Sequence, residues 1–158
     1  MKTYTIRKGC HYSNFFPSFF RNTGIFSMSK TIRFTESCRY EIDEPSCVNK
    51  LFGFCFGFGV HRNSVRFGWT YDPNMRCIVI WQYVYSGKKL SKEKVFKCEI
   101  GEEHTYSILL NGSDATLYVN GHIVWSSNVF ADSSFITTLG PYFGGNSRAP
   151  HCITIEEI

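Results

Sequence analysis

Three carboxylates that lie close together, Glu41, Asp43 and Glu44, are the first candidates for chemistry in this chain. A retaining glycosidase needs two carboxyl groups about 5 Å apart, one as nucleophile and one as general acid. Side chains alternate between the two faces of a strand, so Glu41 and Asp43 would share a face and Glu44 would point away. The next position on the shared face is Pro45, which carries no acid. This spacing favours a polar edge strand that ends in a turn over a catalytic site.

Aromatic side chains with polar neighbours form the second candidate site. A sugar packs its apolar C–H face on Trp or Tyr, while polar side chains bond its hydroxyl groups. In the strand pattern from Cys77 to Tyr85, alternation places Trp81 and Tyr83 on one face and Gln82 on the other. Two interpretations stay open: an open platform that binds a glycan, or rings that fill a core or a protein interface. The residues of the predicted platform are Trp69, Trp81, Tyr83, Tyr85, Arg66 and Gln82.

Other catalytic and metal-binding patterns are absent from the sequence. Its five histidines have no HxH or HExxH spacing, so no zinc site is expected. There is no G-x-S-x-G motif and no P-loop. Asp72-Pro73-Asn74 and the run from Asn111 to Asp114 are rich in oxygen ligands, but turn chemistry explains them better than calcium binding. We therefore expect no metal, no cofactor and no catalytic residue.

The elements that must hold these residues are strands. Aromatic residues make up 17% of the chain and helix formers are sparse, which is typical of an all-β protein. Asn120-Gly121 readily forms a type I′ turn, so it predicts a tight hairpin. We predict a single domain over residues 1–158, a two-sheet antiparallel sandwich. The predicted strands are Tyr4 to Lys8, Ile25 to Phe34, Arg39 to Asp43, Leu51 to Gly59, Ser64 to Tyr71, Cys77 to Tyr85, Val95 to Ile100, His104 to Leu110, Ala115 to Asn120, His122 to Trp125, Phe135 to Leu139 and His151 to Glu157.

Charge and cysteine content indicate which partners and which cellular compartment to expect. A net charge of +4 is mild, so no nucleic-acid partner is expected. The seven cysteines are odd in number and form no CxxC pair, which favours free thiols in a reducing compartment. The N-terminus lacks the apolar core of a signal peptide, and the apolar run from Leu51 to Val60 is too short to span a bilayer. A lysine group predicts a solvated hairpin or edge strand, or else a contact with an acidic partner: Lys88, Lys89, Lys92, Lys94 and Lys97.

Several stretches resemble known families. The run from Glu41 to Pro45 resembles the catalytic strand of family 16 glycoside hydrolases, whose E-x-D-x-E pattern places three carboxylates on one face. Pro45 stands where that pattern has its third carboxylate, so the general acid is missing. The run from Leu139 to Ile155 resembles the closing segment of concanavalin A-like sandwiches, and the Asn120-Gly121 hairpin resembles a piece of laminin-G-like and concanavalin A-like β-sandwiches. These resemblances imply a jelly roll whose last strand pairs near the first.

The middle of the chain, from Asn49 to Phe54 and from Asn63 to Trp69, is similar to short proteins of gut Bacteroides and their crAss-like tailed phages. This resemblance implies a non-catalytic virion structural protein, a capsid decoration or head-fibre protein assembled in the host cytoplasm. Its expected partners are other virion proteins, in an oligomeric assembly, and its exposed face would bind bacterial or mucosal glycans. Two alternatives stay open: a stand-alone carbohydrate-binding module, and a divergent family 16-like glycosidase.

Overall fold

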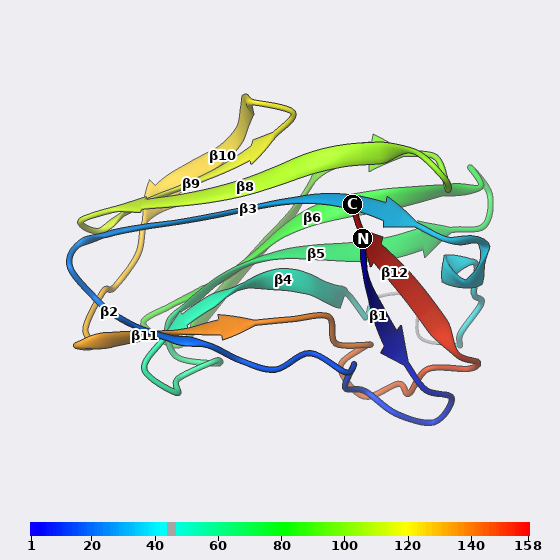
Figure 1. The fold of residues 1–158 in the computed structure, drawn as a ribbon, viewed down its shortest axis with the longest axis horizontal. Helices are drawn as coiled ribbons and strands as arrows, with labels where there is room; N and C mark the ends of the chain where they lie inside the picture. Colours follow the sequence, from blue (N-terminus) through cyan, green and yellow to red (C-terminus); the bar gives the residue numbers. More distant parts are fainter. Residues whose placement is uncertain (44–46) are drawn as a thin grey trace.

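The computed structural model describes residues 1–43 and 47–158, and these residues form mainly β-strands (Figure 1). One 3-10 turn, η1 (Glu36–Cys38), is the only helical element in the described part of the chain, and it is far too short to cross a membrane. The strands are β1 (Lys2–Ile6), β2 (Phe19–Arg21), β3 (Ile25–Phe34), β4 (Asn49–Phe56), β5 (Ser64–Asp72), β6 (Cys77–Ser86), β7 (Lys89–Cys98), β8 (Glu103–Asn111), β9 (Asp114–Val119), β10 (His122–Asn128), β11 (Phe135–Leu139) and β12 (Ile153–Glu157).

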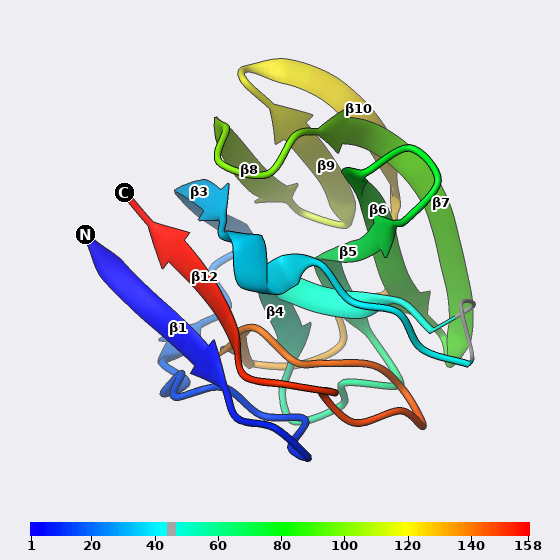
Figure 2. The same cartoon turned by 90° about the vertical axis from the view of Figure 1, so that its right-hand side faces the viewer.

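The strands form two antiparallel sheets that pack face to face, as Figure 1 and Figure 2 show. The first sheet has the order β1-β12-β3-β8-β9-β10, and the second sheet has the order β2-β11-β4-β5-β6-β7. β1 pairs with β12, so the first and last strands lie side by side, as the resemblance of the closing segment implied. The predicted fold class, an antiparallel two-sheet jelly-roll sandwich, is confirmed.

The core lies between the sheets and is built from alternate residues of their strands. On β5, Val65, Phe67 and Trp69 are fully buried in it. The ring centroid of Trp69 lies 5.3 Å from that of Phe34 in the first sheet. Each such side chain contributes about 2–3 kcal/mol of hydrophobic free energy, so the core fixes β5 firmly. Because side chains alternate, Arg66, between Val65 and Phe67, points to the outer face of the second sheet.

Two tight hairpins follow from residues that take positive φ. Asn120 (φ 50°) and Gly121 (φ 79°) connect β9 to β10, which confirms the predicted type I′ hairpin. Gly87 (φ 56°) and Lys88 (φ 66°) make the same kind of two-residue connection between β6 and β7. β7 therefore begins at Lys89, well before the predicted start at Val95. β7 is an edge strand of the second sheet, and the lysine group lies on it and on the turn before it. This agrees with the predicted solvated hairpin or edge strand.

The prediction of a strand from Arg39 to Asp43 is wrong. Just before this segment the backbone makes the 3-10 turn η1, in which the Cys38 amide donates to the Thr35 carbonyl at 2.9 Å. The turn carries the Cys38 side chain into the core, where it is fully buried. The residues from Arg39 to Asp43 then run outside both sheets, while Glu44 and Pro45 lie outside the described residues. No sequence pattern predicts β2, because a strand of three residues is too short to show alternation.

Candidate functional site: a basic pocket on the outer face of the second sheet

A pocket of about 600 Å³ lies on the outer face of the second sheet. Its floor comes from β4, β5 and β6, where Arg66 pairs with Gly53 on one side and Tyr83 on the other. Its walls come from the segment after β1 and the segment after β11. We call it the Arg66 pocket, and its lining residues are Tyr12, Ser13, Phe15, Pro17, Lys50, Val60, His61, Arg66, Tyr83, Tyr85, Thr138, Leu139, Gly140, Pro141, Tyr142, Gly145 and Asn146.

Arg66 is the central cation of this pocket. Its side chain is only 5% exposed, and its buried Nε and Nη2 atoms have no hydrogen-bond partner. Burial lowers the pKa of Arg66, and the guanidinium carbon lies 5.2 Å from the centroid of the Tyr83 ring. Gly53 makes room for it, since a Cβ there would lie 2.7 Å from Arg66 Cγ and 2.1 Å from the Val65 carbonyl oxygen. Among the described residues, those that line the pocket include no Asp or Glu.

Lys50 is the second cation, and it is also buried, at 7% exposure. Its Nζ donates hydrogen bonds to the carbonyl oxygens of Val48 at 2.9 Å and Gly144 at 2.8 Å. The same nitrogen lies 4.7 Å from the ring centroid of Tyr83 and 5.7 Å from that of Tyr142. Burial, followed by repulsion from Arg66, lowers the pKa of Lys50 to about 8.

The Tyr142 wall, formed by the segment after β11, is hydrogen-bonded directly to β4. The backbones of Lys50 and Tyr142 exchange two hydrogen bonds, of 2.8 and 3.0 Å. Asn49 Oδ1 accepts a further bond from the Gly144 amide at 2.6 Å. On the other side, the ring of His11 stacks on Tyr142 with their centroids 5.1 Å apart. These contacts place the Tyr142 backbone against β4 and stack its ring on His11 at the pocket.

Two phenol groups of the pocket, those of Tyr83 and Tyr142, keep their protons over a wide pH range. Burial raises the pKa of Tyr83 to about 12, and burial also raises the pKa of Tyr142. Tyr85 lies beside Tyr83, with ring centroids 6.0 Å apart, and contacts the ring of His61 at 5.4 Å. The pocket thus combines two buried cations with protonated hydroxyl donors, which suits an anionic ligand that also carries polar oxygen atoms.

The structure brings together three of the six predicted platform residues, namely Arg66, Tyr83 and Tyr85. Trp81 lies on the same face but outside the pocket, where its Nε1 donates to Thr70 Oγ1 at 2.9 Å.

Trp69 and Gln82 require a correction, because both side chains are completely buried and neither lines the pocket. Trp69 packs in the core. The Gln82 side-chain amide lies on the inner face, 2.8 Å from Ser91 Oγ. A glycan on the outer face cannot reach either side chain.

Sequence reasoning missed Lys50, His61 and Tyr142. Lys50 directly precedes the long apolar run of β4, and a lysine within a buried strand is an unusual position that could have marked it. Tyr142 lies within the run from Leu139 to Ile155, which predicts the fold and not a site. Its approach to Lys50 depends on two segments far apart in the chain, so no local pattern predicts it.

Of the carboxylates considered for hydrolysis, the two that the structure describes do not line the Arg66 pocket. Glu41 and Asp43 are exposed on the segment after η1, and Glu44 is outside the described residues. Glu41 lines a separate groove with Tyr40, Tyr71 and Asn74, among others. Neither Glu41 nor Asp43 lines the Arg66 pocket, so the geometry does not support a family 16-like glycosidase. No group of His, Cys, Asp and Glu side chains in residues 1–43 and 47–158 is arranged to hold a metal ion.

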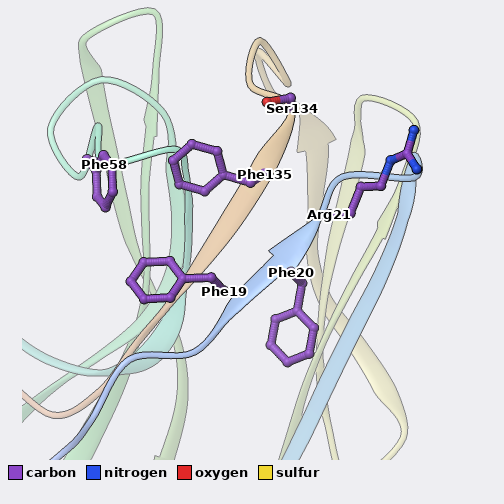
Figure 3. Close-up of a pocket in the computed structure, with 6 residues that line it drawn as sticks. All are labelled: Phe19, Phe20, Arg21, Phe58, Ser134 and Phe135. Atoms are coloured by element: carbon purple, nitrogen blue, oxygen red, sulfur yellow. The ribbon is translucent and has the colours of Figure 1, made fainter.

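An exposed cluster of three rings lies on the outer face near the edge of the same sheet. Figure 3 shows Phe19, Phe58 and Phe135 pointing toward one another, while Phe20 lies apart from them. The Phe58 centroid is 5.1 Å from that of Phe135 and 6.1 Å from that of Phe19. Phe58 is 76% exposed and Phe19 is 59% exposed, so both present apolar faces to solvent. We call these three residues the aromatic patch.

Comparisons with known proteins give structural neighbours but no sequence relatives. No family model and no curated protein matches the sequence. The fold is similar to that of the alginate lyase AlyC3, with a TM-score of 0.71 and 10% identity over 98% of this chain and 71% of that one. It is also similar to the PL7 alginate lyase AlyA1 from Zobellia galactanivorans, with a TM-score of 0.59 and 13% identity over 89% of this chain and 62% of that one.

A third neighbour comes from work on endo-acting O-glycanases with which prominent members of the human gut microbiota initiate mucin breakdown. Its TM-score is 0.60, with 12% identity over 97% of this chain and 75% of that one. At these identities the similarity shows the fold, and it agrees with a concanavalin A-like sandwich.

These neighbours correct two functional expectations. Alginate lyases recur among them, which contradicts the expectation of a non-catalytic virion structural protein. The same finding contradicts the expectation that the chain is not an enzyme. The comparisons give no support for a bacteriophage, virion or capsid role. They fit better with the alternative of a carbohydrate-binding module.

Proposed function

We propose that this chain is a polysaccharide lyase that takes an anionic, uronate-containing glycan into the Arg66 pocket. The observation that carries the proposal is Arg66 itself, a buried guanidinium with two unpartnered nitrogen atoms in a pocket that also holds a buried lysine. Arg66 Nε and Nη2 have no acceptor within the protein. A sugar carboxylate would supply one, since it accepts two parallel N–H bonds from one guanidinium. The recurrence of alginate lyases among proteins of the same fold supports this choice of substrate class.

The pocket also suits the chemistry of a lyase. In β-elimination, a base removes the proton from the carbon next to the carboxylate, and the glycosidic oxygen on the neighbouring carbon leaves. Arg66 would stabilise the negative charge that develops on the carboxylate as the proton departs. Tyr142 would donate a proton to the leaving oxygen. A raised pKa keeps its hydroxyl protonated at neutral pH, as a general acid requires.

The test is cleavage of defined polymers by the purified chain. Polymannuronate, polyguluronate and polygalacturonate are the substrates, and a neutral β-glucan is the control. β-Elimination creates a double bond conjugated with the carboxylate, which is followed by its ultraviolet absorbance. We expect product from at least one polyuronate and none from the glucan. Hydrolysis without a new double bond, or no product from any of the acidic polymers, would contradict the proposal.

Arg66→Met provides the site-specific arm of this test. Loss of a charge-assisted contact should weaken binding of a uronate oligosaccharide by about 10- to 100-fold, as measured by calorimetry. Arg7→Met is the matched control, because Arg7 is exposed and does not line the pocket. Equal affinities of the two variants would place the ligand elsewhere on the molecule.

A binding module that holds the same glycan without cutting it is the second candidate. The observation that favours it is the lining of the pocket, which among the described residues offers no Asp or Glu to act as a base. Binding that depends on Arg66, with no double-bond product from any polyuronate, would select this candidate over the lyase.

A further inference from the structure

We infer that Lys50 is the general base of the Arg66 pocket, an assignment that rests on the proposed lyase function. β-Elimination needs a group that accepts a proton from the carbon next to the bound carboxylate. Lys50 lines the pocket from the start of β4, beside Arg66, and its amine faces the rings of Tyr83 and Tyr142. A carboxylate bound by Arg66 would therefore bring its adjacent carbon close to this amine.

A neutral amine at Lys50 can make both observed hydrogen bonds, as an ammonium can. A neutral amine has two N–H bonds, and the carbonyl oxygens of Val48 and Gly144 accept two bonds from Nζ. The remaining tetrahedral position then holds the lone pair, which is the proton acceptor. Both carbonyls belong to the rigid backbone around β4 and the Tyr142 wall, so the amine is held in place before substrate arrives.

Burial and repulsion from Arg66 favour the neutral form of Lys50, whereas Cys47 and the rings of Tyr83 and Tyr142 favour the charged form. The charged or titratable groups around it are Arg66, Cys47, Lys92 of β7 and the two tyrosines. Burial and repulsion from Arg66 bring its pKa to about 8, so a useful fraction is unprotonated in mildly alkaline solution. Arg66 cannot take this role, because a guanidinium stays protonated in proteins. The raised pKa values of Tyr83 and Tyr142 keep their hydroxyls protonated, so neither is available to accept a proton. His61 also lines the pocket, but it is exposed and packs against the Tyr85 ring, whereas Lys50 is buried near Arg66.

The step balances without any further reactant. Lys50 Nζ takes the proton, and the electron pair of the broken C–H bond forms the C=C double bond. The bond between the neighbouring carbon and the glycosidic oxygen breaks, and that oxygen takes the hydroxyl proton of Tyr142. Lys50 is then an ammonium and Tyr142 a phenolate. Proton return from Lys50 to Tyr142 through solvent restores both groups for the next turnover.

The decisive experiment is chemical rescue of Lys50→Ala. We expect this variant to lose about 100-fold or more in kcat on the polyuronate that the wild type cleaves, with KM changed little. Ethylamine or methylamine, which fit the space left by the side chain, should restore part of the rate in proportion to the concentration of free amine. Lys97→Ala is the control, since Lys97 is an exposed lysine on β7 whose Nζ contacts Met75, outside the pocket. Its rate should equal that of the wild type.

Two measurements on the wild type test the assignment of Lys50 even if Lys50→Ala folds poorly. The rate should rise with pH up to about 8 and then level off, following the pKa of Lys50. Carbon-13 NMR of labelled lysines should show one side chain titrating at that same pH, and Lys50→Arg should remove that resonance. A folded Lys50→Ala that cleaves at the wild-type rate, or is inactive but not rescued by amines, would overturn the assignment and leave the lyase proposal standing. A wild type that cleaves no polyuronate would overturn both.

Discussion

The buried position of Arg66 lowers the stability of the folded chain. Its guanidinium is buried, and two of its nitrogen atoms have no partner. We therefore expect Arg66→Met, which keeps the apolar stem, to leave the free energy of unfolding unchanged or raise it by about 1–2 kcal/mol. Denaturant titration measures this.

Arg33→Met is the matched control, because Arg33 pairs with Glu103 and Glu156 at the surface. It should lose up to about 1 kcal/mol. A loss of stability in Arg66→Met greater than that of the control would show that Arg66 serves the fold rather than a ligand.

Lys50 makes the stability of the protein depend on pH in a defined direction. Its pKa falls from 10.5 to about 8 on folding, so the folded chain binds fewer protons between these values. The buried Lys50 therefore lowers the free energy of unfolding below pH 8, and this loss disappears as the pH rises from about 8 to 10.5. Wild type should gain up to about 3 kcal/mol relative to Lys50→Met over the window, as measured by unfolding at a series of pH values. A stability difference that stays constant across the window would refute the shifted pKa.

At the scale of elements, β4 and β5 approach so closely that a side chain is excluded between them. A Cβ on Gly53 would lie 2.1 Å from the Val65 carbonyl oxygen and 2.6 Å from Arg66 Cα. Gly53→Ala should therefore destabilise the chain by about 1–3 kcal/mol or more and displace Arg66. Thermal unfolding and binding of a uronate oligosaccharide test the two effects. Gly145→Ala is the stability control, since its nearest contact would be Cys47 Sγ at 3.9 Å. Equal stability of the two variants would contradict the proposed crowding.

The strand patterns of β5 and β6 predicted Arg66, Tyr83 and Tyr85 correctly as neighbours in one site, but they wrongly added Trp69 and Gln82. Alternation shows which side chains share a face, so Arg66 and Tyr83 could be predicted to lie apart from Trp69 and Gln82. It does not show which face meets the other sheet when both faces carry apolar or aromatic residues. The packing of Trp69 against Phe34 settles this, and Phe34 comes from a different sheet.

At the scale of the whole molecule, the aromatic patch and the Arg66 pocket share the outer face of the second sheet. Phe19 pairs with Thr137, Thr137 with Cys55 and Cys55 with Ser64, which alternates with the core residue Val65. A polymer that fills the pocket can thus extend across β4 and β11 to the patch. This arrangement predicts that the length of the bound glycan matters.

Phe58→Ser tests this extension. It should weaken binding of long uronate oligosaccharides by about 3- to 10-fold, the effect of one lost aromatic contact, and leave short ones unchanged. Calorimetry over a series of chain lengths measures it. Ile123→Ser, at a 64% exposed position on β10 of the first sheet, removes comparable apolar surface and should change neither. An identical loss at every chain length in Phe58→Ser would refute the extended site.

The sequence by itself determined the fold class and the local turns of this protein. Strand periodicity and the backbone preferences of Asn120 and Gly121 act over a few residues, so they can be read directly from the chain. Only the tertiary structure decided the site. Lys50 and Tyr142 are far apart in sequence and meet because the segment after β11 pairs with the start of β4. The burial that alters their chemistry is a property of the assembled sandwich, and no single segment carries it.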